Sequence, residues 1–214
     1  MERDEPILVR EGWPFAAAGA FVCLFTAALG LTGPAWAFFL LTLAVAAFFR
    51  NPHRSPPEDP KAIVSPADGR VLDVRRVEGS PLFAGPQWKV SIFMSPLDVH
   101  VNRAPVSGTV RCRRYRPGRF HVASRWDASS ENERMEMLLE ADAGYPVGVV
   151  QIAGTLARRI VCYPREGEHL GRGERFGLIR FGSRVELHLP AQIEPVVRQG
   201  DRVRAGESVM GYGP

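Results

Sequence analysis

The segment from Trp13 to Phe49 contains no charged residue, and this property limits the fold more than any other feature of the sequence. It is too long for a single ordinary membrane span, because about 20 apolar residues cross a bilayer core. The letters "LTGP" at residues 31–34 divide it, since glycine and proline interrupt helices. We predict an N-terminal α-helical membrane hairpin with helices over residues 14–30 and 35–49, each at the short end of what a bilayer requires.

The charges beside the hairpin indicate its orientation. Arg10 precedes it, Arg50 and Arg54 follow it, and the connecting loop is uncharged. Because basic flanks stay on the cytoplasmic side, we predict that both ends lie at the cytoplasmic face of the cell membrane. A cleaved signal peptide is one alternative, since Arg3 and Arg10 precede an apolar stretch, but that stretch continues past any cleavage-like site. Tight peripheral attachment is another alternative.

The remainder of the chain has the pattern of a β domain. Residues 51–60, "NPHRSPPEDP", form a Pro-rich linker, and short Val- and Ile-rich runs separated by turn residues follow it. The segments "GEHLGRGE" (167–174) and "GDRVRAGE" (200–207) share one pattern, which predicts the same glycine-supported turn twice. Such turns resemble those of biotinyl and lipoyl carriers. We therefore predict a helical hairpin over residues 1–50 and a mostly β, hybrid barrel-sandwich-like catalytic domain over residues 61–214.

Cysteine and charge patterns exclude several kinds of site. Cys23 lies in the apolar segment, and Cys112 and Cys162 are isolated, so neither a disulfide framework nor a metal site is expected. The net charge is +4, and "RCRRYRPGRFHVASR" (111–125) is rich in arginine. This run is typical of a solvated strand face or of attraction to anionic lipid. No nucleic-acid-binding motif accompanies it, so we expect no nucleic acid partner.

The pair Gly182-Ser183 interrupts a strand-like pattern in "GLIRFGSRVELHLP" (177–190). The residues after it alternate between apolar and polar, which predicts a half-buried strand: Val185, Leu187 and Leu189 against Arg184, Glu186 and His188. One interpretation of the pair is a tight turn between two strands. The other is self-processing, in which the serine hydroxyl attacks the carbonyl of Gly182 and converts the amide to an ester. Elimination would leave dehydroalanine, which hydrolyses to a pyruvoyl group and ammonia.

Self-processing requires a base, and histidine titrates in the right range. His100, in "SPLDVHVNRAPVSG", follows a strand and precedes a loop, where an oriented imidazole is well placed. His121, in "RFHVAS", is the alternative. Asp68, in "SPADGRV", lies in a glycine-supported turn and is either a turn former or a carboxylate that assists the base. The remaining histidines are predicted to be solvated: His53, His169 and His188.

The order of several motifs resembles the phosphatidylserine decarboxylase proenzymes, in particular the short bacterial and archaeal type. These motifs are "SPADG", "MSPLDVHVNRAPVSG", "FHVAS" followed by "ENER", "VVQIAGTLARRIV" and "GRGERFGLIRFGSRVEL". The similarity covers roughly residues 50–190, and the hairpin also resembles that subfamily. The resemblance implies cleavage between Gly182 and Ser183 and conversion of Ser183 to the pyruvoyl cofactor. It also implies a heterodimer of a β chain (1–182) and an α chain (183–214), which could assemble further.

The resemblance further implies that Asp68 and a histidine form a processing triad with Ser183. His100 matches the first of two histidines in the long type of the family, and Arg103 falls where the second stands. The implied reaction is decarboxylation of phosphatidylserine to phosphatidylethanolamine, with the pyruvoyl carbonyl condensing with the substrate's amine. Asn132 and Arg134 in "ENER" are candidates for binding the phosphate or carboxylate of this anionic lipid.

Two alternatives to this function stay open on the sequence. The first is decarboxylation of a related seryl lipid such as archaetidylserine. The second is a non-enzymatic, membrane-tethered module of the lipoyl or biotinyl kind. Such carriers need a modifiable lysine at a hairpin tip, and neither Lys61 nor Lys89 has that setting.

Overall fold

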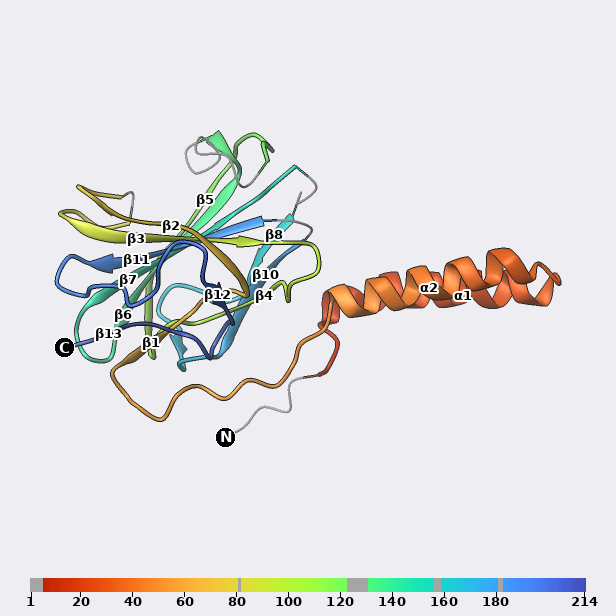
Figure 1. Cartoon of the computed structure of the whole chain (residues 1–214), viewed down its shortest axis with the longest axis horizontal. Coiled ribbons are helices and arrows are strands. Elements are labelled where there is room, and N and C mark those ends of the chain that lie inside the picture. Colours follow the sequence, from red (N-terminus) through yellow and green to blue (C-terminus); the bar gives the residue numbers. More distant parts are fainter. Residues whose placement is uncertain (1–5, 81, 123–130, 156–158, 181–182) are drawn as a thin grey trace. The chain divides into compact units, whose positions relative to one another are not determined.

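The computed structural model describes residues 6–80, 82–122, 131–155, 159–180 and 183–214. The chain divides into two compact units, Met1–His53 and Arg54–Pro214. The first unit is helical and the second is built from strands, as Figure 1 shows.

The first unit contains the predicted helical hairpin. A short 3-10 turn, η1 (Arg10–Gly12), leads into α1 (Trp13–Ala28), and α2 (Thr32–Phe48) returns. Gly30, with φ +74°, makes the turn between the helices, because this left-handed conformation suits glycine. Pro34 lies inside the first turn of α2, where a missing N–H costs no helical hydrogen bond. The break therefore falls before "TGP" rather than within it.

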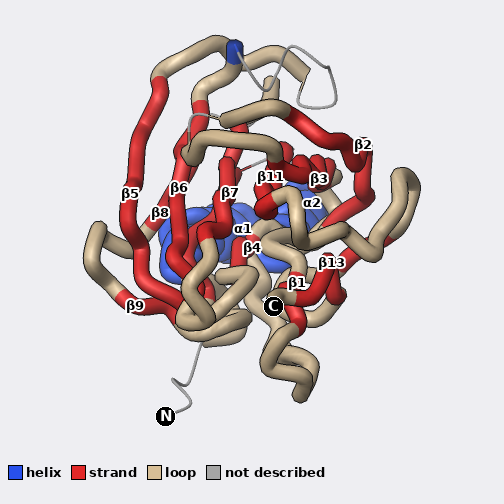
Figure 2. Tube along the Cα trace, turned by 90° about the vertical axis from the view of Figure 1, so that its left-hand side faces the viewer, coloured by secondary structure: helices blue, strands red, loops and turns tan. Residues whose placement is uncertain are grey.

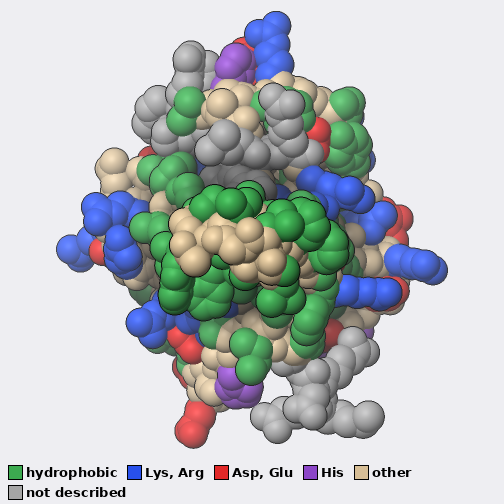
Figure 3. Space-filling model, turned by 90° about the vertical axis from the view of Figure 1, so that its right-hand side faces the viewer, with side chains coloured by type: hydrophobic (Ala, Val, Ile, Leu, Met, Phe, Trp, Pro, Cys, Tyr) green, Lys and Arg blue, Asp and Glu red, His purple; other side chains and the backbone are tan. Residues whose placement is uncertain are grey.

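The hairpin presents apolar side chains on all sides. Its exposed large residues include Phe21, Leu24, Trp36 and Leu40. Figure 3 shows green hydrophobic atoms around a tan centre in the part that faces the viewer. Exposed apolar surface of this extent is typical of a membrane or protein contact. The helical stretch Arg10–Ala28 is long and apolar enough to cross a membrane, and Thr32–Phe48 is a shorter apolar helix. The hairpin is thus compatible with membrane association.

The described residues of the second unit form three antiparallel sheets. Its strands are β1 (Ala62–Val64), β2 (Gly69–Val77), β3 (Gln87–Met94), β4 (Val101–Arg103), β5 (Gly108–Arg116), β6 (Arg134–Ala141), β7 (Pro146–Ile152), β8 (Arg159–Cys162), β9 (His169–Leu170), β10 (Arg175–Arg180), β11 (Ser183–Pro190), β12 (Arg202–Val203) and β13 (Val209–Tyr212). The eight-stranded sheet has the order β12-β2-β3-β11-β7-β6-β5-β9. The smaller sheets are β4-β10-β8 and β1-β13.

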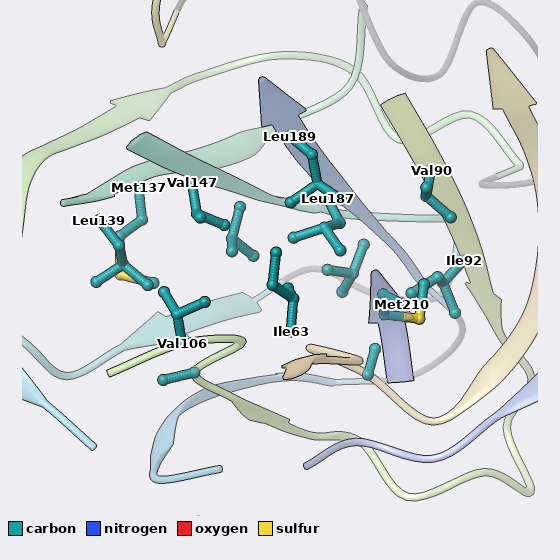
Figure 4. Close-up of a cluster of buried hydrophobic side chains, with 14 of the residues drawn as sticks. Ile63, Val90, Ile92, Val106, Met137, Leu139, Val147, Leu187, Leu189 and Met210 are labelled. Carbon is teal, nitrogen blue, oxygen red and sulfur yellow. The ribbon is translucent and has the colours of Figure 1, made fainter. Parts of the chain in front are cut away.

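The large sheet curls into a half-barrel, and Figure 2 shows its strands following one another around the curve. The core fills this curve with side chains from all three sheets (Figure 4). Ile63 of β1, Ile92 of β3, Leu187 of β11 and Met210 of β13 meet there, each fully buried. The prediction of a mostly β, hybrid barrel-sandwich-like domain after a helical hairpin is confirmed.

An internal repeat relates two halves of the β unit. The turn "SPADG" (65–69) leads into β2, and the similar turn "APVSG" (104–108) leads into β5. The halves exchange backbone hydrogen bonds reciprocally, because Val64 N donates to Pro105 O at 2.9 Å and Arg103 N donates to Pro66 O at 3.0 Å. Each half also has the predicted glycine-supported turn, with Gly206 at φ +76° and Gly173 at φ +79°.

The two repeated turns dock in the same way. Gly206 N donates to Ser65 O, and Gly173 N donates to Ala104 O, both at 2.8 Å. β12 then pairs with β2, and β9 pairs with β5. The residues of one half therefore have structural counterparts in the other, which allows matched comparisons between positions.

Strand β11 differs from its sequence-based expectation. The alternating pattern predicts one solvated face, but all eight residues of β11 are buried. One face packs into the core through Val185, Leu187 and Leu189. The other face is also covered, since Leu82 and Phe83 approach Gly148 opposite His188. The prediction that His188 is solvated is accordingly wrong.

Candidate active site

Ser183 is the first residue of β11 and is fully buried. The preceding strand β10 belongs to the three-stranded sheet, so the chain changes sheets between Arg180 and Ser183. Gly182, the other half of the predicted cleavage site, lies outside the described residues. Among the described residues, Ser183 Oγ makes one hydrogen-bond contact, to the thioether sulfur of Met94 at 3.4 Å. A thioether is a weak acceptor, so no strong partner of this hydroxyl lies among the described residues.

His100 precedes β4 and is 1% exposed. Its Nδ1 lies 2.9 Å from the carbonyl oxygen of Asp98. A carbonyl only accepts hydrogen bonds, so Nδ1 carries the proton and the neutral ring has its lone pair on Nε2. Asp98 is itself fixed, because its carboxylate accepts a bond from Ser95 N at 2.7 Å. The backbone carbonyl of Asp98 therefore fixes the tautomer and orientation of the ring.

Asp68 lies at the end of the turn before β2 and is mostly buried. Its Oδ1 accepts a hydrogen bond from Ala205 N, and its Oδ2 accepts one from Arg54 Nη2, each at 2.7 Å. Burial raises the pKa of Asp68, although the bond from Ala205 and the charge of Arg54 act in the opposite direction. The nearby charge of Asp98 raises the pKa further. A carboxyl group perturbed in this way is typical of functional sites.

Contacts across the sheets bring these three residues into one region. Ile179 N of β10 donates to His100 O, shortly before the chain reaches Ser183. Met94, which contacts Ser183, also accepts a weak bond from Asn102 Nδ2. The same amide nitrogen donates to Pro66 O in the turn that carries Asp68. Ser183, His100 and Asp68 are therefore linked through Met94 and the strand β4.

Gln151 adds an unsatisfied polar atom to this region. Its Nε2 donates to Asn102 Oδ1 at 2.8 Å and to Val161 O at 3.3 Å, and both partners can only accept. This fixes the orientation of the amide, and its Oε1 is buried with no hydrogen-bond partner among the described residues. Gln151 pairs with Val185, two residues after Ser183. A buried acceptor without a partner costs stability, so its retention here suits a binding site.

Asn132 and Arg134, the candidates for substrate binding, both have partners within the chain. Asn132 is fully buried, and its side chain bonds the backbone of His121 twice and Ala153 O once. Arg134 Nε donates to Glu136 Oε1 at 2.9 Å. Asn132 therefore holds the backbone of His121 and Ala153, and contact of either residue with substrate stays a prediction. His121, the alternative base, lies 3.2 Å from Glu131 and is partly exposed.

Sequence reasoning missed four residues of this region: Arg54, Met94, Asn102 and Gln151. Arg54 was assigned only to a linker and to membrane orientation, although the motif "NPHRSPP" places an arginine among prolines. Asn102 and Gln151 interrupt apolar strand patterns, which is a usable signal for a buried polar group. Met94 resembles any core residue, and nothing in its sequence context distinguishes it.

Fold and site together define a barrel-sandwich protein with a buried serine in a setting suited to acyl chemistry. The sequence profile of the phosphatidylserine decarboxylase family matches residues 41–211. The phosphatidylserine decarboxylase proenzyme of Pelobacter propionicus is 46% identical over 218 residues, which cover 99% of each chain. That of Burkholderia mallei is 44% identical over 210 residues, covering 98% of this chain and 97% of the other. This chain belongs to the phosphatidylserine decarboxylase family.

Proposed function

We propose that this chain is a proenzyme that cuts itself between Gly182 and Ser183 and then decarboxylates phosphatidylserine to phosphatidylethanolamine. Family membership supports the reaction, since its relatives carry the name phosphatidylserine decarboxylase proenzyme. The observation that carries the assignment of the site is the position of Ser183. It is buried at the start of a central strand, directly after the chain changes sheets, and His100 and Asp68 belong to the same region.

The cutting step uses groups of the chain alone. Nε2 of His100 takes the proton from Ser183 Oγ, and the oxygen attacks the carbonyl carbon of Gly182. The C–N bond breaks, the nitrogen of Ser183 takes up a proton to become an amine, and residues 182 and 183 are joined by an ester. Asp68 supplies a negative charge that stabilises the protonated imidazole, as carboxylates do in serine triads.

Elimination completes the cut. Loss of the Cα proton of Ser183 expels the carboxylate of Gly182 and leaves a dehydroalanine, which isomerises to an imine. Water hydrolyses this group, ammonia departs, and a pyruvoyl group blocks the new N-terminus. No oxidant is needed, because the serine side chain is dehydrated rather than oxidised.

The surroundings of Ser183 fit a pyruvoyl group. Such a group supplies a carbonyl that condenses with the substrate's amine and accepts the electrons left when carbon dioxide departs. Met94 makes only a weak contact with the side chain at position 183, so loss of the hydroxyl breaks no strong bond to the part of the chain that the structure describes. Gln151 Oε1 is a buried acceptor for the substrate's amine, and Asn102 and Val161 hold its amide in place.

Strand pairing keeps the two products of cleavage together. β11 pairs with β3 from Ser183 to Pro190 and with β7 from Arg184 to His188. β12 and β13 of the same fragment pair with β2 and β1. The α chain 183–214 therefore stays bound to the β chain 1–182 through these strand pairs. The two chains form a heterodimer, which could assemble further.

The apolar hairpin attaches the chain to the bilayer that contains its substrate. Phosphatidylserine stays in the bilayer, and the basic flanks of the hairpin favour the cytoplasmic face, where anionic lipid attracts arginine. Arg134 and the arginines of residues 111–125 are the candidates for binding the lipid's phosphate or carboxylate.

Intact mass and product analysis of the full chain test this function. Wild type should give two chains and convert phosphatidylserine in mixed vesicles, whereas Ser183→Ala should remain one chain without activity. Ser55→Ala is the matched control, since it removes an exposed hydroxyl from the same unit but should still be cut. An active, full-length chain with an unmodified Ser183 would refute the proposal.

A further inference from the structure

The two oxygens of the Asp68 carboxylate have different kinds of partner. Oδ1 accepts a hydrogen bond from a backbone group, Ala205 N. Oδ2 accepts one from a side chain, Arg54 Nη2, which also forms an ion pair with it. The internal repeat shows which of these contacts belongs to the fold alone.

Ser107 is the counterpart of Asp68 in the second half of the repeat. Its Oγ accepts a hydrogen bond from Arg172 N at 2.9 Å, and Arg172 is the counterpart of Ala205. In the second half a serine hydroxyl therefore accepts the hydrogen bond from the backbone N–H of the turn. In the first half Asp68 Oδ1 accepts the corresponding bond. The fold needs one acceptor at this position, and a carboxylate is more than it requires.

The second oxygen has an arginine partner that is itself closely held. Arg54 is 8% exposed at its side chain, and its Nη1 donates to Glu207 Oε2 at 2.9 Å. Glu174, the counterpart of Glu207, instead accepts a bond from Gly171 N in its own turn. Arg54 thus joins two acids of the first half. It is the residue that directly follows the N-terminal unit in the chain.

We propose that Arg54 is a positioning residue for self-cleavage, which holds Asp68 Oδ2 in place and keeps the carboxylate ionised beside Ser183 and His100. This inference rests on the proposed function. Arginine suits the task because its guanidinium is always charged and its donors have a rigid geometry. Without it, a mostly buried carboxylate would take up a proton more readily.

Other charged groups near Asp68 do not replace Arg54. Asp98 is negative and acts against ionisation of Asp68. Glu207 is also negative, and Arg204 lies 3.9 Å from Glu207. Arg103 donates to Gly173 O at 2.9 Å in the second half of the repeat. Removal of Arg54 should therefore leave the carboxylate protonated over a wider range of acidic pH.

The test follows the rate of self-cleavage of the full chain against pH. The chain is synthesised in a cell-free system with phospholipid nanodiscs, and the uncut and cut forms are quantified on gels over time. Arg54→Gln should slow cutting by about tenfold or more at neutral pH. This is less than the effect of removing a general base, because Arg54 acts only through Asp68. Its rate should also begin to fall at a higher pH than that of wild type, because Asp68 loses its counter-charge.

Two variants separate positioning from a purely structural role. Arg54→Lys retains the positive charge and should recover the wild-type pH dependence, although at a lower rate. Glu207→Gln removes the charge of the other partner of Arg54. In this variant the cutting rate should not begin to fall at a higher pH than in wild type. A structural contact would instead change the rate of both Arg54 variants without changing the pH dependence, and that result would overturn the inference.

Asp68→Ser provides a second route if Arg54→Gln does not fold. It reproduces the acceptor of Ser107, so the turn should still dock and thermal unfolding should remain cooperative. Absence of cutting in the folded variant supports the inference that Oδ2 is needed, and normal cutting overturns it. If wild type is cut and makes product, and Arg54→Gln is cut at the same rate with the same pH dependence, the inference about Arg54 fails but the proposed function stands. If wild type is not cut, the proposed function itself fails.

Discussion

Replacement of Glu186 with glutamine should destabilise the β unit strongly. Glu186 is 4% exposed, and its carboxylate lies 2.9 Å from Arg184 Nη2, 3.3 Å from Lys89 Nζ and 3.6 Å from His188 Nε2. Lys89 and Arg184 are also buried, with side chains 7% and 2% exposed. Glu186→Gln keeps the shape of the side chain but leaves these two cations without their shared counter-charge.

The size of the effect follows from the burial of all three groups. Removal of one partner from a buried ion pair costs about 3–5 kcal/mol, because the remaining charge is desolvated without compensation. In a domain of this size, 1 kcal/mol lowers Tm by about 2–4 °C. Glu186→Gln should therefore lower Tm by roughly 6–20 °C, a large part of the usual stability of a domain.

The effect should also depend on pH. Burial alone would raise the pKa of Glu186, but the hydrogen bond from His188 and the charges of Arg184 and Lys89 hold the pKa far below its usual value of 4.5. Because the pKa of the folded state is the lower one, the stabilisation is complete above pH 4.5 and is lost as the pH falls below it. The difference in Tm between parent and variant should shrink in acid.

Differential scanning fluorimetry of the full chain in detergent measures this difference, with Ser183→Ala as the uncut parent. Glu140→Gln is the matched control. Glu140 pairs with Arg111 at 2.5 Å, but the two side chains are 46% and 58% exposed, so its loss should cost less than about 1 kcal/mol. A Tm for Glu186→Gln within 2 °C of the parent at neutral pH, or a difference that grows in acid, would refute the reasoning.

Further predictions concern the processing residues and the hairpin. Asp68→Ala and His100→Ala should accumulate as uncut chains on gels, slowed by about a hundredfold or more, since cutting needs both the base and its charge partner. If His100→Ala is cut normally but decarboxylates poorly, His100 handles substrate, and His121 is the next base to test. The full chain should resist carbonate extraction from membranes because residues 13–49 form an apolar hairpin, and a tag after Phe49 that is accessible from outside the cell would contradict the predicted orientation.

The sequence by itself determined the elements whose cause is local. The helical hairpin follows from an apolar segment without charge and a glycine turn, and the repeated turns follow from glycines that adopt positive φ. The strand content follows from short β-branched runs between turn residues. Family motifs also indicated Asp68, His100 and Ser183, and the structure places these residues in one region.

Tertiary structure decided what depends on neighbours distant in the chain. Alternation along β11 correctly separated its two faces, but only the folded structure shows that both faces are covered, so that Glu186 and His188 are buried. Periodicity describes one strand and carries no information about the layer outside it. The burial of the polar face of β11 therefore depended on residues distant in the chain, such as Leu82 and Phe83 near Gly148 opposite His188.

The role of Arg54 also depends on contacts with residues that are distant in the chain. It lies in a proline-rich segment, and its partners Asp68 and Glu207 are 14 and 153 positions away in the chain. Likewise, His100 is oriented by the carbonyl of Asp98, a backbone group that every residue type possesses. Residue types at a given spacing can indicate which groups take part in the chemistry, but only the folded chain determines which oxygen meets which nitrogen.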